Sequence, residues 1–112
     1  MMMTSSVTKS FDEDKIYDKE SDFQVDAQAF IKSMGGCPFK LFTSAYGKKG
    51  DPDLVCCYKG LFVAFELKVK DNKPSKLQDN KLRKVINAGG IAKPVWTLRE
   101  IKETLNEISR IQ

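Results

Sequence analysis

The chain has 112 residues, of which 41% are hydrophobic and 30% charged, as expected for one soluble globular domain. No apolar run approaches the roughly 18 residues that a membrane span needs, and a net charge of +4 favours a polyanionic partner. The sequence contains no histidine, which excludes Ser-His-Asp and Cys-His nucleophile systems. Any catalysis must therefore use carboxylates, lysine, tyrosine or a metal held by oxygen.

Residues 1–19 are predicted to be a disordered leader, because they are mostly polar and charged and lack the apolar segment of a signal peptide. Residues 20–112 are predicted to form a single domain. Its first helix begins at Ser21, where apolar residues recur at helical spacing, and ends before Gly35-Gly36. A short strand is predicted over 39–43, followed by a loop.

Two strands are predicted next, over residues 53–58 and 61–70. They are joined at Lys59-Gly60, which suits a tight hairpin turn. In the second strand, alternation places Glu66 and Lys68 on one face, while the apolar residues Leu61, Val63, Phe65, Leu67 and Val69 share the other.

The last three elements are a helix from Ser75 to about Ala88, a strand over 91–96 and an amphipathic helix over 98–111. Pro94 cannot donate a ladder hydrogen bond, so its strand is predicted to lie at a sheet edge or to end early. The predicted order is α-β-β-β-α-β-α, with no internal repeat.

The chain has three cysteines without CxxC spacing, Cys37, Cys56 and Cys57. We expect small buried hydrophobes in a reducing compartment, with Cys56 and Cys57 on opposite faces of a strand. Without histidine, there are too few ligands for a zinc site.

The hairpin raises an electrostatic problem. If Lys59-Gly60 is a two-residue turn, counting back along the strands places Asp53 directly across from Glu66, and like charges in that position destabilise a sheet. A divalent cation such as Mg²⁺ would compensate, with Lys68 placed to contact the attacking water or a phosphate. The alternative is a solvent-facing hairpin with a Glu/Lys pair on its wet side, and a slip of one residue would separate the two acids.

The residues of this hairpin also match the motif of a known protein family. Pro52-Asp53 followed by Glu66-Leu67-Lys68 resembles the PD-(D/E)xK nuclease superfamily, and "KKGDPDLV", "GLFVAFELK", "SKLQ" and "NAGGIAKPVW" together resemble its small VRR-NUC group. The similarity covers about residues 20–105. It implies an α/β, restriction-endonuclease-like core, in which a mixed sheet is flanked by helices.

The resemblance also implies roles for particular residues. Asp53 and Glu66 would bind the metal, Lys68 would be the catalytic lysine, and the carbonyl of Leu67 would be a further ligand. Gln78 matches a glutamine near the active site. The sequence offers Gln78 a second role, because Ser75 and Gln78 have capping-box spacing at a helix start.

The family adds a glutamate on its first helix, and we favour Glu20 as a catalytic and metal-binding residue. Asp22 and Asp26 are rivals for this position. Ser21 and Gln24 also have the spacing of a capping box, which would leave Glu20 outside the helix.

The function implied is a Mg²⁺-dependent endonuclease that hydrolyses DNA phosphodiester bonds, with Mn²⁺ able to substitute. Small members of this kind resemble viral or phage enzymes that cut branched DNA, such as Holliday junctions, as homodimers, here in the host cytoplasm and without membrane association. The alternatives are a sequence-specific or flap- or nick-processing nuclease, or a catalytically inactive DNA-binding module. Basic side chains around the site are expected to contact DNA phosphates, namely Lys48, Lys49, Lys70, Lys73 and Lys76.

Overall fold

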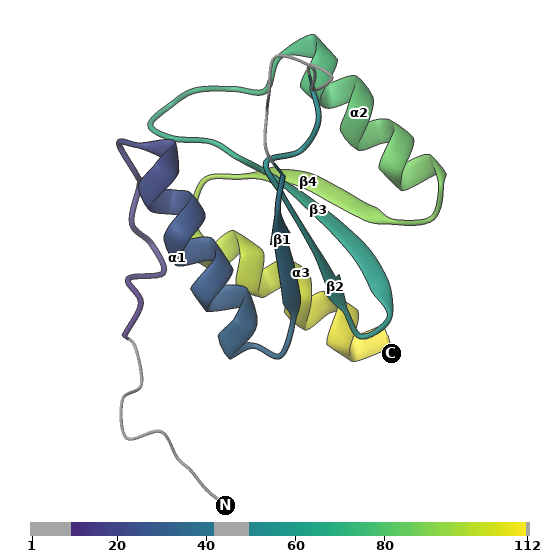
Figure 1. The fold of residues 1–112 in the computed structure, drawn as a ribbon, viewed down its shortest axis with the longest axis horizontal. Coiled ribbons are helices and arrows are strands. Elements are labelled where there is room, and N and C mark those ends of the chain that lie inside the picture. The colour runs from purple at the N-terminus through teal and green to yellow at the C-terminus, as the bar shows by residue number, and fades with distance from the viewer. Residues whose placement is uncertain (1–9, 42–49, 112) are drawn as a thin grey trace, which may run out of the picture.

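The computed structural model describes residues 10–41 and 50–111. Its helices and strands follow the predicted α-β-β-β-α-β-α order (Figure 1). The elements are α1 (Glu20–Ser33), β1 (Cys37–Lys40), β2 (Leu54–Tyr58), β3 (Leu61–Leu67), α2 (Lys76–Asn87), β4 (Ile91–Val95) and α3 (Leu98–Ile111). No helix in the described ranges is long and apolar enough to cross a membrane.

Several strand boundaries differ from the sequence prediction, by one to three residues. β1 begins at Cys37 rather than at residue 39, because it pairs along β2 with Cys37 opposite Cys57. β3 ends at Leu67 rather than at residue 70, because Lys70 has a φ of 53° that leaves the extended conformation and its N–H donates to the carbonyl of Tyr17.

The four strands form one mixed sheet in the order β1-β2-β3-β4. β1 and β3 each pair antiparallel with β2, and β4 runs parallel to β3. The strand that contains Pro94 is therefore at an edge, as predicted.

The turn between β2 and β3 fixes the hairpin register. Lys59 and Gly60 have φ values of 50° and 82°, and two positive values in succession are what a type I′ turn requires. Tyr58 lies opposite Leu61 and Val55 opposite Ala64, so the predicted register is confirmed. Asp53, immediately before β2, is thereby brought to the end of β3.

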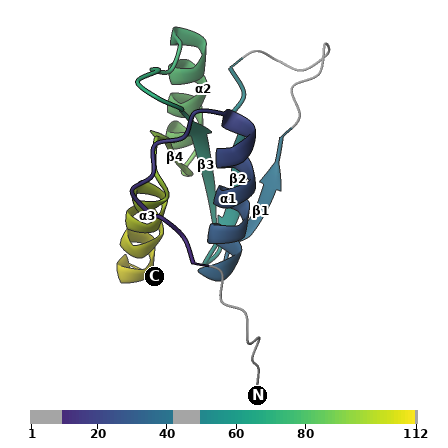
Figure 2. The ribbon, with the colours of Figure 1, turned by 90° about the vertical axis from the view of Figure 1, so that its left-hand side faces the viewer.

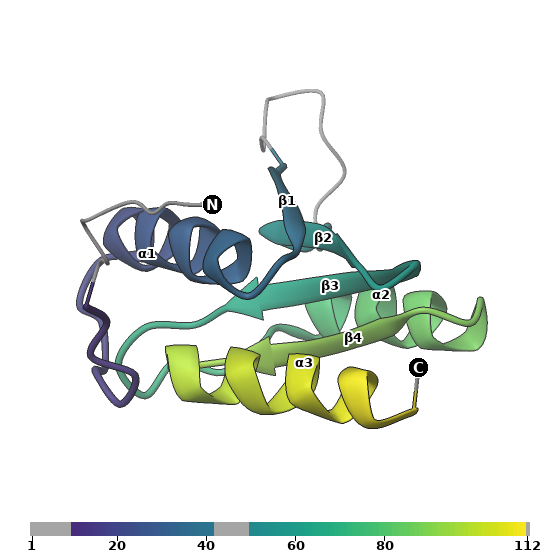
Figure 3. The same ribbon diagram turned by 90° about the horizontal axis from the view of Figure 1, so that it is seen from below.

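Helices cover both faces of the sheet. α1 and α3 pack on one face, where a large core includes Ile31, Phe65 and Leu105. α2 packs on the other face through Leu82, which contacts a much smaller cluster beneath it. Figure 3 shows α3 and α2 on opposite sides of β3 and β4, and Figure 2 shows α1 beside β1.

Residues 10–19, assigned by the sequence to a disordered leader, are packed against the domain. The ring of Phe11 meets Phe30 edge to face at 5.1 Å, and Tyr17 is 1% exposed and stacks on Phe23 at 4.6 Å. These aromatic side chains anchor an otherwise polar segment by burying apolar area. The packed unit therefore begins ahead of residue 20, while residues 1–9 lie outside the described part of the chain.

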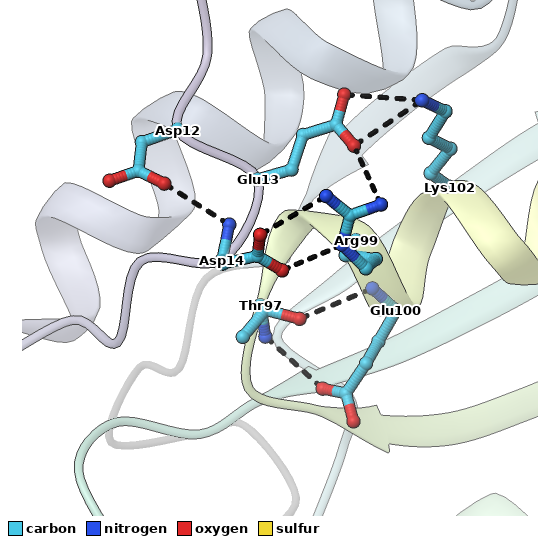
Figure 4. A network of polar contacts seen from close by, with 7 residues as sticks. All are labelled: Asp12, Glu13, Asp14, Thr97, Arg99, Glu100 and Lys102. Carbon is cyan, nitrogen blue, oxygen red and sulfur yellow. Dashed lines mark hydrogen bonds and ion pairs between the residues drawn. The ribbon is translucent and has the colours of Figure 1, made fainter.

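Ion pairs fasten the same segment to α3 (Figure 4). Arg99 donates to both carboxylate oxygens of Asp14, at 2.6 and 3.1 Å, and also pairs with Glu13. Lys102 lies 3.3 Å from Glu13. The N-terminal segment thus links α3 to the start of α1.

The cysteines do not share one environment. Cys56 is buried as expected. Cys37 and Cys57 are exposed; they lie opposite each other on β1 and β2, on the face of the sheet away from Cys56. α2 packs over β3 and β4 and leaves the β1 side of that face open, which explains the difference.

Candidate functional site

Asp53 is held at the junction of three chain segments. Its Oδ2 accepts a hydrogen bond from the N–H of Leu67 at 2.9 Å, which caps the end of β3. The preceding Gly50 has a φ of 89°, and a Cβ there would lie 2.8 Å from the carbonyl oxygen of Leu77. Glycine therefore allows the segment before Asp53 to approach α2 closely.

Glu66 lies on the α2 side of β3 and is 1% exposed. Its Oε2 accepts a hydrogen bond from Nε2 of Gln78 at 2.7 Å and is 4.0 Å from Nζ of Lys68. Its Oε1 is buried and has no hydrogen-bond partner among the described residues. A buried carboxylate with an unsatisfied oxygen is costly to the fold and needs a physical reason.

Gln78 forms the predicted helix cap and also contacts two candidate site residues, Glu66 and Lys68. It completes a capping box at the start of α2, with its N–H donating to Oγ of Ser75 and its Oε1 accepting from the N–H of Ser75. The same Oε1 accepts from Lys68 at 3.3 Å, while Nε2 donates to Glu66. The cap therefore fixes the amide that orients the glutamate.

The first helix brings Glu20 to the site. α1 begins at Glu20 with Lys19 as its N-cap and no side-chain cap, so the capping box considered for Ser21 and Gln24 does not form. Glu20 lies close enough to Asp53 for the charge of that carboxylate to raise the pKa of Glu20. Of the two rivals, Asp26 accepts a hydrogen bond from Tyr17 at 2.7 Å and Asp22 is exposed.

The acids perturb one another. Burial, followed by the charge of Asp53, raises the pKa of Glu66 to about 9, against a smaller opposite effect of Lys68. Desolvation and Asp53 raise the pKa of Glu20 to about 7, although part of that side chain is exposed. Both pKa shifts follow first from burial and then from the negative charge of Asp53, which Lys68 offsets only in part.

Sequence reasoning missed one buried polar residue beside this cluster. Gln24 is 5% exposed and its Nε2 donates to the carbonyl oxygen of Asp53 at 3.1 Å. Its position within the apolar stripe of α1 was the available signal, because a glutamine among core residues needs polar partners.

The predicted DNA-contacting lysines fall into two groups. Lys70, Lys73 and Lys76 are exposed along the segment from the end of β3 to the start of α2, within a few residues of Lys68 or Gln78. Lys48 and Lys49 lie outside the described residues.

The donor set fits a hard divalent cation. In the described ranges no three acidic, cysteine or histidine side chains form a metal-ligand set of their own. Mg²⁺ typically uses one or two carboxylates and completes its shell with waters and substrate phosphates. Asp53 and Glu66 meet that need, and the unsatisfied Oε1 of Glu66 is the kind of oxygen that such a cation binds.

Comparison of the sequence with protein-family models and with curated proteins gives no match. A solved structure described as a VRR_NUC domain matches with a TM-score of 0.64 and 24% identity, covering 78% of this chain and 94% of that chain. The chain has the fold of a VRR_NUC domain. This match confirms the fold resemblance read from the sequence and the α/β architecture.

In this VRR_NUC-like fold, the residues that resemble the PD-(D/E)xK motif come from separate elements. Asp53 precedes β2, Glu66 and Leu67 end β3, and Lys68 follows directly. Glu20 starts α1 and Gln78 lies in the first turn of α2. The carboxylates, the lysine and the glutamine therefore meet at one end of the β2–β3 hairpin.

Proposed function

We propose that this protein is a divalent-metal-dependent nuclease that hydrolyses phosphodiester bonds in DNA. The observation that carries the proposal is the buried Glu66 carboxylate, which has one oxygen without a donor and lies beside Asp53 and Lys68. A fold with no use for this arrangement would lose stability by keeping it. The VRR_NUC-like fold supports the same class of reaction.

Each residue of the site has a proposed task. Asp53 and Glu66 would hold Mg²⁺, or Mn²⁺ in its place, with the carbonyl of Leu67 as a further ligand and Glu20 as the third acid. The cation would supply charge stabilisation to the phosphodiester as it is attacked. Lys68 would orient the attacking water and help to remove its proton, and Gln78 would keep Glu66 and Lys68 in position.

The proposed substrate is branched DNA recognised by shape. Lys70, Lys73 and Lys76 are exposed and close in sequence to Lys68 or Gln78, and they would form a basic rim beside the site. Contacts from such side chains to phosphates position the nucleic acid without reading its sequence. We further propose that the protein acts as a homodimer, since a junction presents two equivalent strands.

A cleavage assay tests this function directly. Purified protein is incubated with four-way junctions, flaps and linear duplex of unrelated sequences, with Mg²⁺, with Mn²⁺ and with a chelator. We expect cleavage that requires the cation and is fastest on junctions. The preferred substrate separates a junction-cutting enzyme from a flap nuclease or a sequence-specific one.

Two results would contradict the proposal. Cleavage that persists at full rate in chelator would exclude the metal mechanism. Binding of all three DNAs without cleavage under any condition would favour a DNA-binding module that retains the fold of a nuclease.

A further inference from the structure

The two polar atoms of the Gln24 amide differ in their hydrogen bonding. Nε2 donates to the carbonyl oxygen of Asp53, whereas Oε1 is buried and has no hydrogen-bond partner within the described residues. The side chain as a whole is 5% exposed. A buried acceptor without a donor carries the full cost of its lost hydration.

Anchoring Asp53 does not explain this residue. The carbonyl oxygen of Asp53 also accepts a hydrogen bond from the N–H of Leu41, at 3.2 Å, so it would keep a partner without Gln24. An apolar side chain of similar volume at position 24 would suit the helix and would bury no unsatisfied oxygen. The glutamine is therefore expected to serve something that the protein binds.

The missing partner has to be a hydrogen-bond donor. Oε1 of Glu66 is also buried without a donor in the described part of the chain. Both residues neighbour Asp53, because the Gln24 side chain donates to the backbone carbonyl of Asp53 and the charge of Asp53 acts on the Glu66 carboxyl group. A DNA phosphate offers only acceptor oxygens and cannot satisfy an amide oxygen. A hydrated cation brings positive charge for the carboxylates and water hydrogens for the amide.

We propose that Gln24 is a binding residue of the cation site. Its Oε1 accepts a hydrogen bond from a water molecule of the hydrated divalent cation, while its Nε2 holds the backbone of Asp53. The inference rests on the cation site of the proposed function and adds to it a residue outside the PD-(D/E)xK motif. Residues that act on a metal through such outer contacts typically change its affinity by about 10–100-fold.

The test compares Gln24→Leu, Gln24→Glu and the control Gln28→Leu, which changes a glutamine one turn further along α1. Thermal unfolding in chelator measures the metal-free fold, and calorimetric titration with Mn²⁺ in the absence of DNA measures binding. For Gln24→Leu we expect a melting temperature in chelator at or above wild type, together with an Mn²⁺ Kd raised about 10–100-fold. Gln24→Glu keeps an acceptor and should bind Mn²⁺ within a few-fold of wild type, as should Gln28→Leu.

Other outcomes overturn the inference. Unchanged Mn²⁺ affinity in Gln24→Leu would show that no water is held there. A loss of metal-free stability that accompanies the loss of affinity, without rescue by Gln24→Glu, would make Gln24 a structural support. If Asp53→Asn abolishes Mn²⁺ binding and Gln24→Leu does not, the inference about Gln24 fails alone. If wild type binds no Mn²⁺, the proposed function fails with it.

Discussion

The side chain of Asp53 serves both the fold and the proposed chemistry. It caps the N–H of Leu67, but its charge also raises the pKa values of Glu20 and Glu66. An asparagine at this position keeps an oxygen that can accept from Leu67 and removes the charge. The stabilising and destabilising contributions of this residue can therefore be separated by one substitution.

We expect Asp53→Asn to be more stable than wild type in chelator. Relief of the repulsion by about 1 kcal/mol corresponds to a rise in melting temperature of about 4–8 °C for a domain of this size. Adding Mg²⁺ or Mn²⁺ should raise the melting temperature of wild type, because a ligand that binds the folded state stabilises it, but not that of the variant. Differential scanning calorimetry measures both effects.

Asp51→Asn is the matched control, because it removes a partly exposed charge that pairs with Lys81 and should change little. A lower melting temperature of Asp53→Asn in chelator would show that its capping role outweighs the repulsion. A normal response of that variant to the cation would remove Asp53 from the metal site.

Lys68 is the side chain on which the catalytic proposal depends. It is mostly buried between Glu66 and Gln78, so its charge would be favoured there even without catalysis. Lys68→Met keeps the length of the stem and removes the charge. We expect this variant to fold and to bind Mg²⁺ and DNA, but to cleave junctions more slowly by a factor of about 10² or more.

Single-turnover cleavage beside calorimetric metal binding measures this prediction. Lys84→Met, which changes an exposed lysine in the last turn of α2, serves as the control and should cleave normally. Cleavage by Lys68→Met within a few-fold of wild type would exclude a catalytic role for this lysine.

Among the elements, α2 depends on its first turn more than on its core contacts. One side chain of this helix, Leu82, is buried, and the capping box of Ser75 and Gln78 starts the helix and fixes Gln78 beside Glu66 and Lys68. We expect Ser75→Ala to lower the free energy of unfolding by about 0.5–2 kcal/mol, the usual cost of a lost N-cap. Cleavage should fall as well, because Gln78 loses its anchor.

Urea unfolding and the junction assay measure the two effects. Ser75→Asn restores an acceptor at the N-cap and should recover most of the stability and the activity. If Ser75→Ala loses stability while cleavage is unchanged, the orientation of Gln78 does not depend on the cap.

Across the molecule, the basic rim determines how DNA binding should respond to salt. Lys73 lies between β3 and α2, and Lys76 is the first residue of α2; both are exposed, whereas Lys102 on α3 pairs with Glu13 of the N-terminal segment. In the Lys68→Met background, which prevents cleavage, we expect Lys73→Gln with Lys76→Gln to weaken binding to all DNA sequences about equally. The slope of log K against log salt should fall by about two units, close to one for each lost phosphate contact.

Fluorescence anisotropy over a series of salt concentrations measures this slope. Lys102→Gln should leave it unchanged. An unchanged slope in the double variant would place the DNA on another surface of the protein.

Local sequence patterns were sufficient to predict the order of the elements and the register of the β2–β3 hairpin. Side-chain periodicity follows from backbone geometry, and Lys59-Gly60 specifies a turn that sets which residues face each other. From that register alone, Asp53 and Glu66 were expected to meet, and Lys68 to share their face. These relations involve residues close together in the chain.

Contacts between segments that are distant in the chain could be determined only from the tertiary structure. Glu20 rather than Asp22 or Asp26 meets Asp53 because packing against the core and the hydrogen bond from Tyr17 to Asp26 set the rotation and start of α1. Residues 10–19 pack because their aromatic side chains find a surface built by α1, which their polar composition concealed. The unsatisfied oxygen of Gln24 becomes apparent when burial removes it from water, since the cost of a polar atom depends on its surroundings in the fold.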